Sequence, residues 1–590
     1  MLTRMTPAQQ ILTLPAQAIF PGLLESAYRR ELQNFSVHNA IARLWAKDSS
    51  LWPTEEYQAE SVKRNLRWLD LPDQLEPLLT RVAARAAMIE QAGFEDVVFV
   101  GMGDSRLAAK AVLRLSAARL GKRSFWLDSI DPDAVRALDE MLHFDRTLFI
   151  FANKSGNQIE THSLLLYFLG RLKMLGIHSP ERHFVILSEE NSYLGELTGE
   201  YNFLDSFLDP PGIHGRYSSL LHFNFFLVWL SRLDPHVLLE RAQVMRDACG
   251  PSAPRETNPA LALAALLAAA EVEGLDRVVI FSPDSLKPVA RRIGYLAAAS
   301  TGKKGRGIVP VFDGPSSRIA MLQRGCFVVL LKMTGEDEPE LGKRCDELRA
   351  ASVPVVTIEL HGPEELAVEL FKWEIATALA CSRLGVDPFH DPDIRESGTR
   401  TAQILEHMAA RRLSASPTVR VREEDIELYA EGETRRQIST LNMAESLHGF
   451  FELRHPEGYI ALLPFLNYGE AQKVIFRRIR ERLESTLALP VLLTPGPRYL
   501  SAIGQLYMGG PAKGLFLLLT ASPVRDLSIP GADYSFGQLQ LALALADFES
   551  LGRRRTPVIR LHLTNGPQRG LSHLETILGN ALGKSRTIAV

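Results

Sequence analysis

The chain has 590 residues, of which 46% are hydrophobic and 23% charged, and its formal net charge is −3. This length exceeds one ordinary domain, and the composition is typical of a protein with large buried cores. The near balance of acidic and basic residues argues against binding of nucleic acid or an anionic membrane by the chain as a whole, and leaves room only for a local basic patch.

The first predicted elements are helices. Residues 22–92 are rich in Leu, Ala, Glu and Arg at helical spacing, which predicts a helical N-terminal region over 1–92. From residue 93 strands alternate with helices, which predicts a parallel sheet in a doubly wound domain over 93–240. Three segments carry this alternation: DVVFVGMGDSRLAAKAVLRL (96–115), RTLFIFANKSGNQIETHSLLLYFLGRL (146–172) and HFVILSEENSYLGEL (183–197).

A second series begins with DRVVIFSPDSLKPVARRIGYLAAASTGKKGRGIVPVFD and continues through the strands CFVVLLKM and VPVVTIEL. It predicts a second domain of the same type over 241–415. After the charged stretch 416–437, further strands are expected within YIALLPFL, VLLTPGPRYLSAIGQLYMGGPAKGLFLLLTAS and VIRLHL, and a helix is expected in GADYSFGQLQLALALADFESLG. These predict a smaller α/β domain over 416–590, and the predicted fold class is therefore α/β with three such domains.

The four cysteines are far apart in the sequence and form no C-x-x-C pair: Cys249, Cys326, Cys345 and Cys381. This spacing predicts buried, reduced thiols in a cytoplasmic protein and gives no indication of a metal site. The opening MLTRMTPAQQILTLPAQ lacks a basic segment followed by an apolar one, and no clean run of about 18 apolar residues follows. We expect neither a signal peptide nor a membrane-spanning helix.

Two polar loops fall where strands end and helices begin, the edge at which such sheets bind ligands. They are GMGDS (101–105) and NKSGNQ (153–158). Arg106 stands where G-x-G-x-x-G needs its third glycine, and Ala297 stands where a Walker A loop ending at Gly302-Lys303 needs its first. The loops therefore suit a phosphate and match neither nucleotide motif, and tight turns without a ligand are the alternative.

A third polar loop, in AASTGKKGRGIVPV (298–311), combines hydroxyls, glycines and three cations. Glycine allows backbone N–H groups to approach an anion closely, so the loop is suited to holding one. It contains no carboxylate, imidazole or thiol, and so offers no general base. GIHGRYSSL (212–220) adds another cation, Arg216, before an apolar helix.

Six ordered motifs resemble the glucose-6-phosphate isomerase family: VGMGDS, NKSGNQIET, GRYSSL, STGKKGRGIVP, FKWEIATALA and GVDPFHDPDI. The chain is similar in particular to the isomerase half of bacterial transaldolase/glucose-6-phosphate isomerase fusion proteins, through GPRYLSAIGQLYMGGPAKGLF (496–516). We find no transaldolase half in these residues. The resemblance implies two sugar-isomerase (SIS-type) domains, a sugar phosphate in the cleft between them, no cofactor or metal, and a cytoplasmic homodimer.

The resemblance also implies which residues contact the ligand. Phosphate binding would involve Ser105, Asn153, Lys154, Ser155, Asn157 and Gln158, and substrate binding Arg216, Thr301 and Lys303. Compared with the family pattern S-K-[ST]-G-T-T-x-E-T, the second loop has lost three hydroxyls but keeps Glu160. The usual G-G-S has become Gly103-Asp104-Ser105, and a carboxylate at Asp104 would repel a phosphate if it faced the cleft.

Isomerisation of an aldose to a ketose moves a proton between adjacent carbons through an enediolate, which requires a base, a ring-opening group and a stabilising cation. Where the family has its base, its catalytic lysine and its ring-opening histidine, this chain has Ala299, Gly398 and Ser501. Asp391 stands where the family has glutamine. The residues that move protons are thus replaced, whereas binding residues are retained.

These replacements predict a protein that binds a sugar phosphate with impaired or absent isomerase activity, as a sensor, scaffold or partner subunit. An active phosphosugar isomerase is the first alternative, with Glu160 or His214 as base and Arg216 stabilising the enediolate. A structural protein whose cleft binds no ligand is the second.

Overall fold

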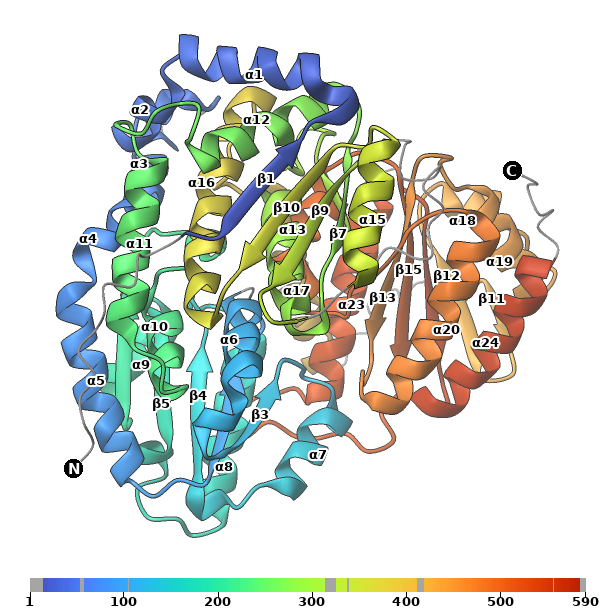
Figure 1. Ribbon diagram of the computed structural model, residues 1–590. Coiled ribbons are helices and arrows are strands. Elements are labelled where there is room, and N and C mark those ends of the chain that lie inside the picture. Colours follow the sequence, from blue (N-terminus) through green and yellow to red (C-terminus); the bar gives the residue numbers. More distant parts are fainter. Residues whose placement is uncertain are drawn as a thin grey trace.

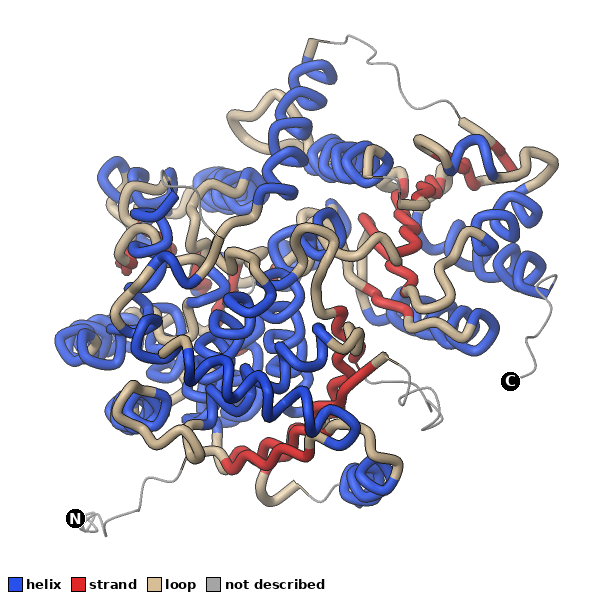
Figure 2. The backbone as a smooth tube through the Cα atoms, turned by 90° about the horizontal axis from the view of Figure 1, so that it is seen from above, coloured by secondary structure: helices blue, strands red, loops and turns tan. Residues whose placement is uncertain are grey.

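The computed structural model describes residues 14–53, 58–103, 105–312, 325–336, 339–410, 419–554 and 556–583. Over these ranges the chain forms three sheets with helices packed against them (Figures 1 and 2). The predicted α/β fold with parallel sheets is confirmed. None of the described helices is long and apolar enough to cross a membrane.

The first sheet is entirely parallel, in the order β3-β2-β4-β5-β6. Every residue of β2 and β4 is buried, as expected when helices cover both faces of a sheet. Its strands are β2 (Asp96–Val100), β3 (Arg123–Leu127), β4 (Thr147–Ala152), β5 (Phe184–Glu189) and β6 (Asp205–Asp209). The accompanying helices are α6 (Ser105–Leu120), α7 (Pro132–Met141), α8 (Ile159–Met174), α9 (Tyr193–Glu200) and α10 (His222–Leu230).

The second sheet has the order β1-β10-β9-β7-β8. Its parallel strands are β7 (Arg277–Phe281), β8 (Val309–Phe312), β9 (Cys326–Met333) and β10 (Val355–Leu360). Its helices are α11 (Pro235–Cys249), α12 (Pro259–Val272), α13 (Lys287–Thr301), α15 (Pro339–Ala350), α16 (Leu366–Leu384) and α17 (Pro392–Ala409).

The N-terminal region is helical as predicted, but it also contains a strand. Its helices are α1 (Glu25–Val37), α2 (Ala40–Trp45), α3 (Ala59–Asn65), α4 (Leu71–Gln74) and α5 (Glu76–Gln91). Before them, β1 (Ala16–Phe20) pairs antiparallel with β10 and forms one edge of the second sheet (Figure 1). The sequence analysis missed β1 because an edge strand with no fully buried residue lacks an apolar run.

The third sheet has the order β11-β12-β16-β15-β13-β14. Its strands are β11 (Val421–Glu423), β12 (Ile426–Ala430), β13 (Tyr459–Phe465), β14 (Val491–Leu493), β15 (Gly514–Ala521) and β16 (Val558–Leu563). Its helices are α18 (Thr434–Gln437), α19 (Met443–Glu452), α20 (Glu470–Leu487), α21 (Tyr499–Ala502), α22 (Gly504–Gly509), α23 (Phe536–Gly552) and α24 (Pro567–Gly583). The charged stretch 416–437, for which no strand was predicted, contains the antiparallel pair β11–β12.

All three sheets contain the same arrangement of four parallel strands. Numbered along the chain within each sheet, the strands lie in the order 2-1-3-4: β3-β2-β4-β5, β8-β7-β9-β10 and β14-β13-β15-β16. In this arrangement the connections leave in opposite directions from strands 1 and 3, which creates a crevice beyond their carboxyl ends where ligands bind. The third unit therefore repeats the topology of the first two.

The third unit packs against the loop that follows α13. Gly305 N donates to Gly509 O at 2.9 Å, and Gln505 Nε2 donates to Gly302 O at 3.1 Å. A Cβ atom on Gly302 would lie 2.5 Å from the Leu506 Cα atom of α22. This backbone approach requires glycine at position 302.

The four cysteines are buried and form no disulfide, as predicted. Burial raises the pKa values of Cys249, Cys326 and Cys381 to about 12. These three thiols are therefore protonated at neutral pH and are poor nucleophiles.

We predict that Gly302→Ala destabilises the protein by about 1–3 kcal/mol, because the added methyl forces α22 away from the loop. Gly398→Ala is the matched control: this helical glycine has no atom within 4 Å of an added Cβ. That substitution should stabilise the protein by about 0.5–1 kcal/mol. Urea unfolding measures both, and equal stability of the two variants would contradict the proposed close packing.

Candidate functional site

The loop between β4 and α8 lies at the switch point of the first sheet and forms a tight turn. Asn153 Oδ1 accepts hydrogen bonds from Ser155 Oγ at 3.1 Å and from Gly156 N at 3.2 Å. The Nδ2 atom of Asn153 and the Oε1 atom of Gln158 are buried and have no hydrogen-bond partner among the described residues. Gln158 also makes no side-chain cap on α8. The turn therefore presents uncapped helix N–H groups and a buried amide donor, which suit an anion.

Lys154 does not extend from this loop as a free cation. Its ammonium group forms an ion pair with Glu189 at 2.6 Å and donates to Pro210 O at 3.2 Å. Glu189 also accepts a hydrogen bond from Gly212 N at 3.0 Å. Lys154 thus ties together the loops that follow β4, β5 and β6, and its charge is already balanced.

The remaining predicted phosphate contacts are less fully defined. Asn157 accepts a hydrogen bond from Tyr193 N at 3.2 Å. Ser105 begins α6, but its side chain lies outside the described atoms, and Asp104 lies outside the described residues. Arg106 is buried and pairs with Asp128 at 3.7 Å.

Three predicted residues converge on one carboxylate, and we call His214, Arg216, Lys303 and Asp391 the Asp391 cluster. The Arg216 guanidinium makes two hydrogen bonds of 2.7 Å to the two carboxylate oxygens of Asp391. His214 Nε2 lies 3.1 Å from Asp391 Oδ2, and Lys303 Nζ lies 3.8 Å from Asp391 Oδ1. Although burial opposes ionisation, Arg216 and His214 hold the pKa of Asp391 well below its usual range.

His214 is fully engaged in this cluster. Its Nδ1 atom accepts a hydrogen bond from Arg216 N at 3.2 Å, so Nε2 carries the proton that is donated to Asp391. Burial and the Arg216 charge lower the pKa of His214 and favour this neutral form. No lone pair of the ring remains to accept a substrate proton, which argues against His214 as the base.

The loop after α13 holds its two predicted residues in different ways. Lys303 is 5% exposed and donates to the backbone carbonyl of Asp387, and burial lowers its pKa to about 8. The Thr301 hydroxyl donates to Ala297 O at 2.6 Å and accepts from Ile308 N at 2.9 Å. Thr301 therefore supports the loop, whereas Lys303 belongs to the Asp391 cluster.

The Asp391 cluster lies next to the β4–α8 loop. A Cβ atom built on Gly215, between His214 and Arg216, would lie 3.9 Å from the Lys154 Cβ atom. Beneath the cluster, Arg292 donates to Arg216 O at 2.6 Å. The structure thus brings the predicted phosphate loop and the predicted substrate cations together.

The three positions at which the resemblance leads us to expect catalytic groups lie in different surroundings. Ala299 is 1% exposed on α13, whereas Gly398 is exposed on α17. Ser501 Oγ is within hydrogen-bonding distance of Arg498 O at 3.2 Å and Met102 O at 3.4 Å. Ser501 therefore places the third unit against the GMGDS loop.

Asp547 of α23 is a buried carboxylate that the sequence analysis missed. Tyr499 Oη donates to it at 2.7 Å, and Ser397 Oγ donates to its other oxygen. Burial, together with the negative charge of Glu160, raises the pKa of Asp547 to about 7. Burial likewise raises the pKa of Glu160 in the first turn of α8. A single acid in the apolar stretch LALALADF was the available signal.

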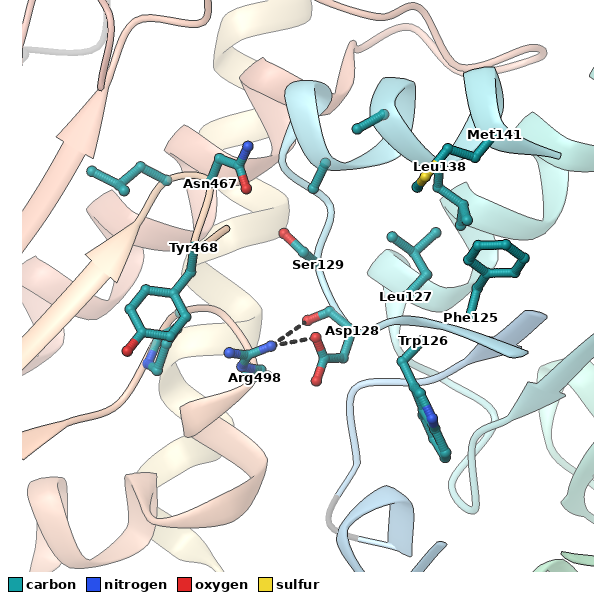
Figure 3. Close-up of a pocket in the computed structure, with 15 residues that line it drawn as sticks. Phe125, Trp126, Leu127, Asp128, Ser129, Leu138, Met141, Asn467, Tyr468 and Arg498 are labelled. Carbon is teal, nitrogen blue, oxygen red and sulfur yellow. Dashed lines mark hydrogen bonds and ion pairs between the residues drawn. The ribbon is translucent and has the colours of Figure 1, made fainter. Parts of the chain in front are cut away.

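Two pockets lie at the boundary with the third unit. The first, about 220 Å³, is lined by residues of β3 and α7 and by the segments that follow β3, β13 and β14, and it is shown in Figure 3. Arg498 points toward Asp128 across it (Figure 3). Lys110 also pairs with Asp128, at 2.7 Å. Neither this pocket, which we call the Asp128 pocket, nor the second is lined by the Asp391 cluster or the β4–α8 loop.

We predict that Asp547→Asn becomes more stable relative to the wild type as pH rises from about 4 to 7. The folded wild type holds the Asp547 proton up to a pKa of about 7, whereas the unfolded chain releases it near the usual value of 3.8. The wild type should therefore lose up to about 1.4 kcal/mol per pH unit relative to the variant. Urea unfolding at several pH values tests this, and a constant difference would contradict it.

No protein-family profile matches the chain. Glucose-6-phosphate isomerase of Borreliella afzelii is 33% identical over 132 residues, which is 21% of this chain and 24% of that enzyme. A protein of Natronomonas pharaonis named "Probable glucose-6-phosphate isomerase" is 29% identical over 349 residues, covering 53% of this chain and 79% of that one. The matched stretch thus spans about a quarter of the first relative's length.

Among solved structures, a hypothetical protein of Thermus thermophilus has a TM-score of 0.55 and 21% identity, covering 66% of this chain and 99% of its own. This likeness concerns the fold alone. The sequence comparisons make the chain similar to glucose-6-phosphate isomerases over part of its length.

Proposed function

We propose that the chain binds a sugar phosphate beside the β4–α8 loop and has impaired or absent aldose–ketose isomerase activity. The observation that carries this proposal is the bidentate ion pair of Arg216 with Asp391. Arg216 is the cation that the reaction would need to stabilise an enediolate, and here it is already paired with a carboxylate of the chain itself.

The binding part of the proposal is supported by the geometry of the β4–α8 loop. Asn153 is 3% exposed, and its Nδ2 atom has no hydrogen-bond partner among the described residues. An unmade hydrogen bond of a buried donor is costly, so an acceptor supplied by a ligand would be favoured there. The uncapped N-terminus of α8 adds a positive dipole. A phosphoryl group satisfies both.

The catalytic part rests on the chemistry of the cluster. A cation stabilises an enediolate only if its charge is directed at the developing oxyanion. Arg216 directs two donors at Asp391 and one also at Pro388 O, at 3.0 Å. His214 has no free lone pair, and the apolar Ala299 lies where the resemblance places the base. The groups present can therefore bind an anion but cannot readily move its protons.

Assembly, cellular location and domain limits remain part of the proposal. The resemblance, which includes the specific likeness to fusion proteins, implies a cytoplasmic homodimer, and the pattern of strands and helices in the sequence predicts the boundaries after residues 92, 240 and 415. An active phosphosugar isomerase that uses Glu160, and a structural protein without a ligand, are the competing outcomes of the tests below.

We expect Asn153→Asp to weaken binding of glucose 6-phosphate about tenfold or more. The new carboxylate keeps the oxygen that accepts from Ser155 and Gly156 but replaces the amide donor with a charge that repels phosphate. Asn442→Asp is the matched control, because Asn442 caps α19 on the surface through its Oδ1 atom. Calorimetry measures affinity, and absence of binding by the wild type across a panel of sugar phosphates would support the structural protein.

In a coupled assay with glucose 6-phosphate and fructose 6-phosphate, we expect wild-type turnover about 10²- to 10⁴-fold below that of an ordinary isomerase, the usual contribution of a positioned base. Ala299→Glu, which restores a carboxylate, should raise the rate, and Asp391→Gln, which frees the Arg216 charge, should raise it further in a variant shown by circular dichroism to be folded, because loss of the buried pair costs about 3–5 kcal/mol. Ordinary wild-type turnover would overturn the proposal. Loss of that turnover in Glu160→Gln would then identify Glu160 as the base.

A further inference from the structure

A second pocket, of about 420 Å³, lies between α13 of the second unit and α20 of the third, and we call it the basic pocket. Its lining contains five cationic side chains and one carboxylate, that of Glu470. The cations are Lys287, Arg291, Lys473, Arg477 and Arg480. This concentration of positive charge contrasts with the net charge of −3 for the whole chain.

Equivalent elements of two units build this pocket. Helix α13 follows β7 and helix α20 follows β13, and each of these strands is the first parallel strand of its sheet. The neighbouring edge strands β8 and β14 contact each other and contribute Phe312 and Val491–Leu493 to the lining. Each helix supplies two cations four residues apart to the lining, and the first cation of each pair has a carboxylate partner: Lys287 pairs with Asp284 at 2.6 Å, and Lys473 pairs with Glu470.

The charges are arranged against the preference of both helices. Lys287 begins α13 and Lys473 lies in the first turn of α20, where the helix dipole disfavours cations, and their ion pairs with Asp284 and Glu470 offset that cost. Arg291 and Arg477 each lie four residues further along and repel the preceding lysine. A bound anion would offset the charge of these two arginines.

Two exposed arginines of the lining, Arg291 and Arg477, have no carboxylate partner among the described residues. Arg480, by contrast, pairs with Glu484 at 2.9 Å and donates to Phe312 O at 3.0 Å. The pocket therefore retains positive charge after its internal ion pairs are formed.

Apolar and hydroxyl groups complete the wall. Tyr295, Ile503 and Thr494 line the basic pocket, and Tyr468 lines both it and the Asp128 pocket. Figure 3 shows Tyr468 on the strand-end loop that it shares with Asn467, next to Arg498. Apolar and hydroxyl side chains therefore line the basic pocket together with its cations.

We propose that the basic pocket is a second anion site, which binds a small molecule carrying two or more phosphoryl groups. Arginine binds phosphoryl oxygens through charge-assisted hydrogen bonds, and one arginine on each of the two helices that has no ion pair over the described residues matches a ligand with more than one charged group. The site is lined by none of the residues of the β4–α8 loop or the Asp391 cluster, and a ligand there would bridge the second and third units.

Titration calorimetry with inorganic tripolyphosphate tests this proposal. We expect saturable binding of one tripolyphosphate per chain by the wild type, and affinity at least about tenfold lower in the double variant Arg291→Gln/Arg477→Gln. The matched control is Arg478→Gln/Arg482→Gln, which removes two charges from the face of α20 turned toward α24. There Arg478 pairs with Glu575 at 2.8 Å, and a Cβ atom on Gly579 would lie 2.7 Å from the Arg482 guanidinium. The control should keep its affinity.

Absence of saturable wild-type binding would overturn the proposal. Equal weakening in both double variants would also overturn it, because it would indicate general electrostatic attraction to the chain and no defined site. Inorganic phosphate should bind more weakly than tripolyphosphate, and equal affinities would exclude a site for several phosphoryl groups. Asn153→Asp should leave tripolyphosphate affinity unchanged, and the Arg291/Arg477 variant should still bind glucose 6-phosphate. The two proposed sites can therefore fail independently.

Discussion

The ion pair between Arg216 and Asp391 is the contact on which the arrangement of the Asp391 cluster depends. It joins the loop after β6 to the segment that precedes α17, and it places a guanidinium that is 2% exposed against a carboxylate that is 8% exposed. A buried arginine without this partner would be strongly destabilising. The same carboxylate orients His214 and attracts Lys303. The cluster is therefore held by its internal charges: Asp391 balances Arg216, and the charge of Lys303 is left over.

Repetition of one strand order in three units explains where charged hollows occur. Each unit presents the carboxyl ends of its parallel strands and the N-termini of the following helices along one edge. The β4–α8 loop uses the crevice of a single unit. The basic pocket instead uses paired elements of two units, and the Asp128 pocket lies between the first and the third. Packing of the third unit thus creates pockets that neither of the first two units has alone.

Much of the fold was predictable because the central strands are buried on both faces and appear as apolar runs, as in VVFV, LFIF and FVVLL. The edge strands β1 and β11 are only partly buried and have no such run. At the site, the loop at 153–158 and Arg216 could be found from local motifs. The pairing of Arg216 with Asp391, 175 residues away, could not, since it arises only when distant loops meet. Burial of Asp547 depends on tertiary packing in the same way.

The N-terminal strand has a consequence for the solution behaviour of the chain. Because β1 covers the outer edge of β10, it satisfies backbone groups over Val355–Leu360. A chain that lacks residues 1–20 would expose β10, with the sequence VVTIEL, as an open sheet edge. Val, Ile and Leu occupy four of its six positions. Open apolar edges recruit strands from other molecules. Residues 16–20, which lie outside both proposed ligand sites, therefore limit self-association by covering the edge of β10.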